Sequence, residues 1–234
     1  MQITCVQHVP IEGPGAIGAW ARRRGHRLSR RQAWRSRFTD RPDGVVVLGG
    51  PMGANDESDH PWLIREKRWL AQQIHRGIPV VGICLGSQIL AEVLGGRAYP
   101  GGTNEIGWFP VERRADAGDS PLRALLPRSF NALHWHGDTF ERPVDAIPLA
   151  MSAAYPEQGF VWGDNVLALQ FHLEITQHDA SRVAAHDSGD LDNGGPWVQP
   201  RETLLASGGH WQAGHGLMDA LLDGFFDTPC RAAA

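Results

Sequence analysis

The sequence predicts a single α/β domain, residues 1–234, with a mostly parallel, doubly wound sheet, helices on both faces and a small antiparallel addition. Two observations lead to this prediction. Short apolar runs that stop in glycine alternate with helix-like stretches through the first hundred residues, as in repeated strand–helix–strand units. From Gly95 onward, short alternating strands with glycine turns follow, which indicates antiparallel pairing. A chain of 234 residues is long enough to bury such a core.

The elements of the first half follow in regular order. Strands are expected at 1–9, 43–50 and 78–84, and helices at 13–25, 60–77 and 85–96. In the second of these helices, Ser58 or Asp59 is the expected cap, Pro61 suits the first turn and Gly77 ends it. The basic stretch 26–40 takes the place of a second strand but is only weakly apolar. We expect it to be an edge strand or a remodelled loop.

The second half contains five expected strands and an unusual tail. The strands are at 96–114, 130–140, 147–154, 158–163 and 165–175. "GDN" at 163–165 predicts a hairpin between the last two. The tail, 186–234, is glycine-rich and polar, and within it only 217–226 has the pattern of a packed helix. Its role is open.

Composition excludes several classes of protein. A formal net charge of −4 argues against general nucleic-acid binding. Cys5, Cys84 and Cys230 are too few and too scattered for a disulfide framework or a zinc site, which fits a reducing compartment. No apolar run approaches the ~20 residues that cross a bilayer, and the first residues carry no basic leader. We therefore expect a cytoplasmic protein with no membrane or nucleic-acid partner.

Basic charge is concentrated in one segment. Nine arginines lie between Arg22 and Arg41, with Asp40 as the only acid among them. A solvated face is the favoured interpretation, because a basic run alone is weak evidence for a partner. The alternative is a docking patch for an anionic partner.

Cys84 lies in "VVGICLGSQIL", where an expected strand meets an expected helix. Such a turn directs its side chain over the carboxyl edge of the sheet, where open α/β sheets carry their sites. Gly82 and Gly86 remove side chains that would crowd the turn, as in a nucleophile elbow. The helix that begins at Leu85 directs free N–H groups at the sulfur and so favours a thiolate. For an isolated cysteine, however, a buried structural role is the simpler interpretation.

Two further motifs decide between these interpretations. In "LALQFHLEIT" the two-residue period of a strand places His172 and Glu174 on one side, where a carboxylate can orient an imidazole that acts as general base and acid. In "VVVLGGPMG" a strand ends in two glycines. The backbone N–H groups of Gly50 and Leu85 could therefore form an oxyanion hole. Alone, each motif is also compatible with a solvated strand or a simple turn.

In combination, "GICLGSQ", the upstream "GGP" and the downstream "QFHLE" resemble the class I glutamine amidotransferases, a family with a Cys-His-Glu triad. The resemblance covers about 45–175, in the family's order and spacing. "NEIGW" and "HWHGDTF" also look like segments of free-standing members related to the amidotransferase domain of GMP synthetases. The resemblance implies a flavodoxin-like fold and no cofactor.

The resemblance also assigns roles by position. Cys84 would attack the glutamine side-chain amide, His172 would transfer protons and Glu174 would orient His172. Gln88 would hold the substrate, with an ordinary polar helix position as the alternative. Further substrate contacts are expected, with less support, from Glu105, Gly107, His136 and Asp138; for the last two, a structural turn at Gly137 is an equal alternative. His134 and His136 could mimic a metal pair, but no third ligand has suitable spacing, so no metal is expected.

Three functions are compatible with these residues. The first is a glutaminase that releases ammonia through a γ-glutamyl thioester and delivers it to a separate synthetase, since no P-loop is present. The second is a free-standing hydrolase or peptidase that acts on another γ-glutamyl small molecule. The third, a non-catalytic binding or regulatory module, is disfavoured by the intact triad.

Overall fold

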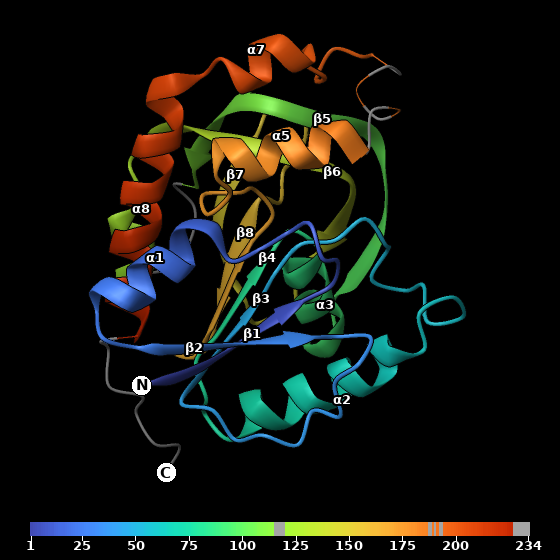
Figure 1. Ribbon diagram of the computed structural model, residues 1–234, viewed down its shortest axis with the longest axis vertical. Coiled ribbons are helices and arrows are strands. Elements are labelled where there is room, and N and C mark those ends of the chain that lie inside the picture. The colour runs from blue at the N-terminus through green and yellow to red at the C-terminus, as the bar shows by residue number, and fades with distance from the viewer. Residues whose placement is uncertain (115–119, 187–188, 190, 192–193, 227–234) are drawn as a thin grey trace.

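The protein is built around one nine-stranded sheet with the strand order β2-β1-β3-β4-β9-β8-β7-β5-β6. The structure, a computed structural model, describes residues 1–114, 120–186, 189, 191 and 194–226 (Figure 1). The parallel half contains β1 (Gln2–Gln7), β2 (Arg27–Gln32), β3 (Gly44–Val47), β4 (Val80–Ile83) and β9 (Val166–Leu169). The antiparallel half contains β5 (Arg97–Arg113), β6 (Ser129–Glu141), β7 (Ile147–Ser152) and β8 (Gly159–Trp162). The predicted α/β class is confirmed, and the parallel half has the flavodoxin-like strand order.

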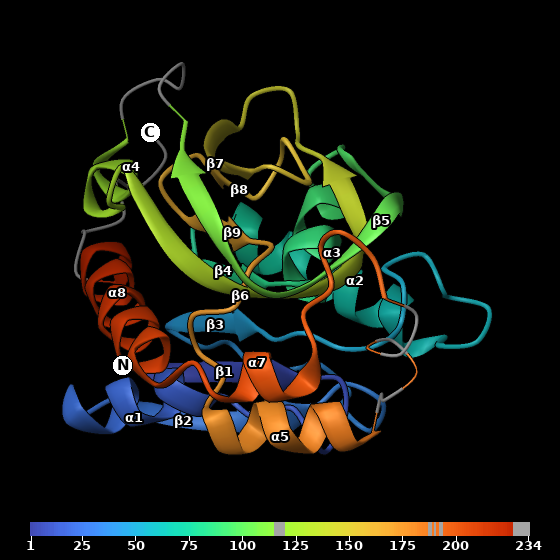
Figure 2. The same ribbon diagram turned by 90° about the horizontal axis from the view of Figure 1, so that it is seen from above.

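Helices cover both faces of the parallel half. The alternation of strand side chains divides the core, so that Val46 faces one apolar cluster and Val47 the other. The first cluster is covered by α1 (Gly15–Arg23) and α8 (Gly208–Phe226), and the second by α2 (Trp62–His75) and α3 (Leu85–Val93). Figure 2 shows α8 and the α2–α3 pair on opposite sides of the strands. This packing fixes the carboxyl ends of β1, β3 and β4 between the two helical layers.

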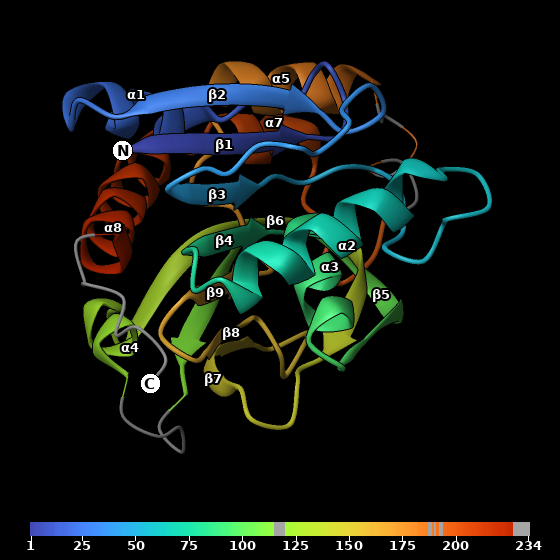
Figure 3. The same ribbon diagram turned by 90° about the horizontal axis from the view of Figure 1, so that it is seen from below.

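The basic stretch is an edge strand, the first of the two predicted alternatives. Figure 3 shows β2 at the outer edge, followed by β1, β3 and β4. Leu28 packs against the core, whereas the arginines of β2 are exposed. Arg23 and Arg24, at the end of α1, form ion pairs with α8. Charge on an exposed edge disfavours pairing with another sheet.

The predicted cap of α2 is wrong. Pro61 is its N-cap, and no side chain caps the helix. Asp59 instead belongs to a preceding turn, in which the N–H groups of Asp59 and His60 donate to Asp56 O at 3.2 and 2.8 Å. Because the chain enters the helix only after this turn, Ser58 and Asp59 lie too far before the first helical residue to cap it. The predicted end is confirmed, because Gly77 has φ +73° directly after the helix.

The hairpin between β8 and β9 is confirmed, but the last predicted strand is too long. Trp162 pairs with Val166, and Gly163 has φ +55°. β9 ends at Leu169, and the chain then bends away from the sheet. Only His172 keeps a bridge, in which its N–H donates to Leu133 O at 2.8 Å.

The second half of the chain, including the tail, contains more helix than the sequence predicted. α4 (Pro121–Leu125) precedes β6, and α5 (Gln177–His186) and α7 (Arg201–Leu205) precede α8. α8 begins at Gly208, nine residues before the predicted helix. Buried Trp211 and Met218 anchor its glycine-rich first half, so tertiary packing outweighs low helix propensity. The structure does not describe residues 187–188, 190 and 192–193 of this tail. Cys230, the last of the three cysteines, also lies outside the described residues.

Within the described ranges, no helix combines the length and apolar character needed to cross a membrane.

Candidate active site

Cys84 occupies a sharp turn between β4 and α3. Its φ of +52° is rare for a residue other than glycine. The turn is held by the Cys84 N–H, which donates to Leu169 O at 2.8 Å, and by the Cys84 carbonyl, which accepts from the N–H of Ser87 at 2.9 Å. A side chain at Gly86 would place Cβ 2.3 Å from Val47 O. The predicted sharp turn from strand to helix is therefore present, and a strained backbone of this kind is found at functional sites.

His172 and Glu174 are brought together beside Cys84. The His172 Nδ1 and Glu174 Oε1 atoms are 2.7 Å apart, and both side chains are buried. The second carboxylate oxygen accepts from the N–H of Leu173 at 3.1 Å. The Cys84 side chain also interacts with the imidazole. Bends after β9 produce this arrangement, rather than the continuous strand that the sequence predicted.

The charge state of His172 follows from these neighbours. Burial alone would lower the pKa of the imidazole, but the Glu174 carboxylate and the Cys84 side chain outweigh burial and raise that pKa well above 6.5. The imidazole can therefore hold a proton near neutral pH and pass it to a leaving group.

Of the two glycines after β3, Gly49 lies against His172 and Cys84, and Gly50 lies at the cavity beside them. A Cβ atom at Gly49 would be 3.3 Å from His172 Cε1 and 3.6 Å from Cys84 Cβ. Gly50 lines the same cavity as Cys84. Among the described residues no acceptor is found for the Gly50 N–H, and the Leu85 N–H at the start of α3 has no intrahelical partner. Both donors predicted for an oxyanion hole are thus available.

The triad opens into a cavity of about 270 Å³. Its described lining residues are Glu12, Gly50, Pro51, Met52, Cys84, Gln88, Asn104, Ile106, Trp135, His136, Gly137, Asp138, His172, Ile175 and Val183. Glu12 and Asp138 are its acidic residues, and no arginine or lysine is among the lining residues that the structure describes. Burial and the nearby Asp56 raise the pKa of Asp138. The cavity thus has the size and polarity to hold a small polar molecule.

A family model described as "Glutamine amidotransferase class-I" matches residues 25–187. The chain belongs to the class-I glutamine amidotransferase family. A crystal structure of a glutamine amidotransferase from Thermotoga maritima, 31% identical, covers 97% of the chain and 99% of its own length with a TM-score of 0.87. The amidotransferase-like protein YfeJ of Salmonella typhimurium is 29% identical over 198 residues, which are 82% of this chain and 83% of YfeJ.

GMP synthases are also similar to this amidotransferase. The glutamine-hydrolysing GMP synthase of Thermomicrobium roseum is 39% identical over 139 residues, which are 57% of this chain. Those residues are 24% of the synthase, so the chain matches about a quarter of that protein.

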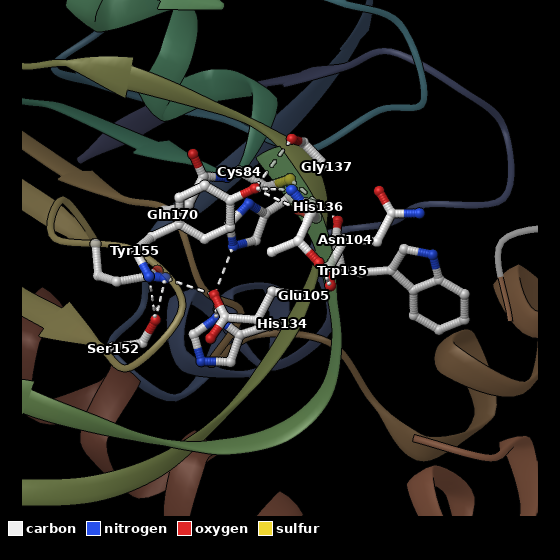
Figure 4. Close-up of polar contacts among 12 residues, drawn as sticks. Cys84, Asn104, Glu105, His134, Trp135, His136, Gly137, Ser152, Tyr155 and Gln170 are labelled. Atoms are coloured by element: carbon white, nitrogen blue, oxygen red, sulfur yellow. Dashed lines mark hydrogen bonds and ion pairs between the residues drawn. The ribbon is translucent and has the colours of Figure 1, made fainter. Parts of the chain in front are cut away.

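Three of the predicted substrate contacts line the cavity of this amidotransferase, and two do not. Gln88, His136 and Asp138 line it. Gly107, at φ +134°, instead packs against Gln199, whose Cγ would be 2.7 Å from an added Cβ. Glu105 is buried behind His136, with Oε2 3.1 Å from His136 Nε2 and 3.2 Å from His134 Nδ1 (Figure 4). The structure therefore gives Glu105 and Gly107 supporting positions outside the cavity.

Glu105 and the two histidines also have the spacing of a metal site. One ligand atom from each lies within 4.8 Å of the others, so Glu105 is the third group that sequence spacing did not reveal. The Glu105 Oε2 atom accepts from Gln158 Nε2 at 2.7 Å. Burial would raise the pKa of Glu105, but hydrogen bonds and charge from His134 and His136 outweigh burial and hold it well below its usual range. We assign the cluster as hydrogen-bonded support for His136.

Sequence reasoning missed several cavity residues, three of which carry polar or aromatic side chains. Glu12, Asn104 and Trp135 line the cavity, and the Cys84 thiol lies 3.7 Å from the Trp135 carbonyl oxygen. Asn104 stands beside the predicted Glu105, and Trp135 lies between the two histidines of "HWHGD". The alternation of an edge-lining strand could have indicated Asn104. Glu12 lies in a loop with no motif, so nothing in the sequence marked it.

Proposed function

We propose that this amidotransferase hydrolyses the side-chain amide of glutamine through a thioester on Cys84. The main support is the contact of His172 with both Cys84 and Glu174 at the base of a cavity. The Cys84 sulfur attacks the amide carbon, and the carbonyl oxygen becomes an oxyanion. N–H groups of Gly50 and Leu85 stabilise that charge as it develops.

The tetrahedral intermediate then collapses. The C–N bond breaks, and His172 gives its proton to the leaving nitrogen, which departs as ammonia. Water attacks the γ-glutamyl thioester, His172 accepts a proton from it, and glutamate leaves Cys84 free. Glu174 keeps the imidazole oriented through both steps. Gln88, His136 and Asp138 would contact the substrate.

We further propose that a synthetase partner receives the ammonia. The similarity to a segment of GMP synthases supports this proposal, because those proteins are described as glutamine-hydrolysing. The alternative is a free-standing hydrolase of other γ-glutamyl compounds. YfeJ supports the alternative, because its whole length is close to that of this chain.

Turnover by the purified protein tests both proposals. Ammonia and glutamate release from glutamine and from γ-glutamyl peptides would be measured beside Cys84→Ala, with expected loss of all turnover in the variant. Preference for peptides would favour the free-standing hydrolase. Glutamine turnover that rises when a synthetase is added would favour the amidotransferase. Equal turnover by wild type and Cys84→Ala would contradict catalysis by Cys84.

A further inference from the structure

His8 is a buried imidazole with an acceptor at each ring nitrogen. It follows β1 and lies between the glycine turn after β3 and the helix α2. Its Nδ1 atom is 2.9 Å from Gly49 O, and its Nε2 atom is 3.0 Å from Glu66 Oε1. Since a carbonyl and a carboxylate can only accept, both nitrogens donate, and His8 is an imidazolium. Burial alone would lower the pKa of His8, but Glu66 outweighs burial and raises it.

The helix α2 holds His8 from the side opposite to the glycine turn. Glu66 has no exposed surface, and a buried carboxylate requires a partner of opposite charge. One turn earlier, the Trp62 ring stacks on the imidazole, with centroids 5.6 Å apart and planes at 23°. The ring of His8 is therefore fixed in both position and tilt.

The hydrogen bond from His8 to the Gly49 carbonyl also fixes the direction of the Gly50 N–H. The Gly49 carbonyl and the Gly50 N–H belong to one planar trans unit and point in opposite directions. A donor held against the carbonyl therefore directs the Gly50 N–H away from His8. Gly50 also packs on His8, since an added Cβ would lie 2.9 Å from His8 Cβ. The face of Gly50 that is left open lines the cavity with Cys84.

We propose that His8, charged and held by Glu66, is a positioning residue for the oxyanion donor at Gly50. This inference rests on the proposed hydrolysis of γ-glutamyl amides. His8 fixes the direction of the N–H before the reaction begins, and a cationic donor on the carbonyl also polarises the peptide and strengthens the N–H as a donor. His8 does not touch the substrate, because it is absent from the described lining of the cavity.

The Glu66→Gln variant separates charge from shape. It keeps a hydrogen-bonding group of the same size, and His8 becomes neutral. We expect kcat for glutamine to fall roughly tenfold with little change in KM, less than the 10²–10³ that loss of a whole oxyanion donor costs. The double variant His8→Asn with Glu66→Gln avoids an unpaired buried carboxylate and is expected to lose more, about 100-fold. Glu141→Gln removes an exposed carboxylate from the Arg97–Glu141 ion pair and serves as the matched control.

A second measurement does not depend on turnover. Glutaric semialdehyde adds to a thiol, and its carbonyl oxygen becomes an oxyanion in the same place as that of the intermediate. Glutarate, which has a carboxylate in place of the aldehyde, cannot form this adduct. For Glu66→Gln we expect aldehyde affinity to fall roughly tenfold, with glutarate affinity unchanged and a far-UV spectrum like that of wild type.

The outcomes separate the two hypotheses. Equal kcat and equal aldehyde affinity in wild type and Glu66→Gln would overturn the role of His8. An equal loss of glutarate and aldehyde affinity would also overturn it, since that pattern reports general damage to the cavity. Aldehyde binding without any γ-glutamyl turnover in wild type would reject only the proposed function. Failure of wild type in both assays would reject both.

Discussion

Cys5 and Cys84 are both buried thiols, yet their surroundings give them different chemistry. Cys5 lies within β1 with no exposed surface, and burial raises its pKa to about 12. Cys84 faces the cavity, where it contacts His172. In a Cys230→Ser background, we expect iodoacetamide at pH 7.5 to alkylate Cys84 and leave Cys5 unmodified, as determined by peptide mass spectrometry. Alkylation of native Cys5, or an inert Cys84, would contradict this assignment.

We predict that Glu174, the partner of His172, sets the alkaline limit of the proposed activity. Glu174 raises the pKa of His172 against the opposing effect of burial. If release of ammonia requires protonated His172, activity is present below that raised pKa and is lost as the pH rises through it. In Glu174→Gln the pKa falls, so the alkaline limb of kcat/KM for glutamine should move to lower pH. An unchanged limb, measured beside Glu141→Gln, would assign the limb to another group.

Residue pairs close in sequence were predictable, and distant pairs were not. His172 and Glu174 are two residues apart, so strand periodicity alone suggested their contact. His8 and Glu66 are 58 residues apart, and His136 and Glu105 are 31 apart. Neither distant contact could be predicted from local pattern, because only the register of the strands and the packing of α2 bring these residues together.

At the scale of elements, the start of α1 supports the triad. The N–H of Ala16 donates to Glu174 O at 2.7 Å. Gly15 has φ +43°, and an added Cβ would lie 2.1 Å from the same oxygen. At the other end of α1, Gly25 has φ +69° but no atom within 4 Å of an added Cβ. The two glycines therefore share backbone strain and differ in what a methyl group would displace.

Alanine substitutions at Gly15 and Gly25 test whether the start of α1 supports Glu174. Gly25→Ala should lose about 1 kcal/mol of unfolding free energy, because alanine is strained at positive φ, and should keep wild-type kcat. Gly15→Ala should be less stable still and should lose roughly 10- to 100-fold in kcat, because Glu174 must shift. Urea unfolding and steady-state kinetics measure both effects. Equal kcat in the two variants would show that the contact between α1 and Glu174 does not affect catalysis.

The elements that sequence predicted poorly are those that tertiary contacts determine. The alternation of apolar strands and helices identified the parallel half, because buried strands must be apolar on both faces. The start of α8 was missed, since glycine weakens a helix locally and the burial of Trp211 and Met218 compensates. The end of β9 was missed because residues after Leu169 keep an alternating pattern while they leave the sheet.

For the whole molecule, Glu105 joins the antiparallel half to the active site. It lies on β5 and contacts His134 and His136 on β6. Because His134 and His136 hold its pKa well below 4.5, against the effect of burial, the carboxylate contributes stability above about pH 4.5, the unfolded value. That stability is lost as the pH falls below it toward the folded pKa. The contacts of Glu105 with the two histidines therefore make the fold less stable at acidic pH.

Glu105→Gln tests this link. At pH 7 we expect a loss of roughly 3 kcal/mol in unfolding free energy, because the buried His134 and His136 lose the carboxylate that they contact. Between pH 4.5 and pH 3.5 the wild type should lose stability more steeply than the variant, since only the wild type must protonate Glu105 when it unfolds. Urea unfolding followed by tryptophan fluorescence measures both, with Glu141→Gln, an exposed site, as the control that keeps the wild-type slope. Parallel curves for wild type and Glu105→Gln would show that Glu105 has the same pKa in the folded and the unfolded protein, so that His134 and His136 do not stabilise its carboxylate.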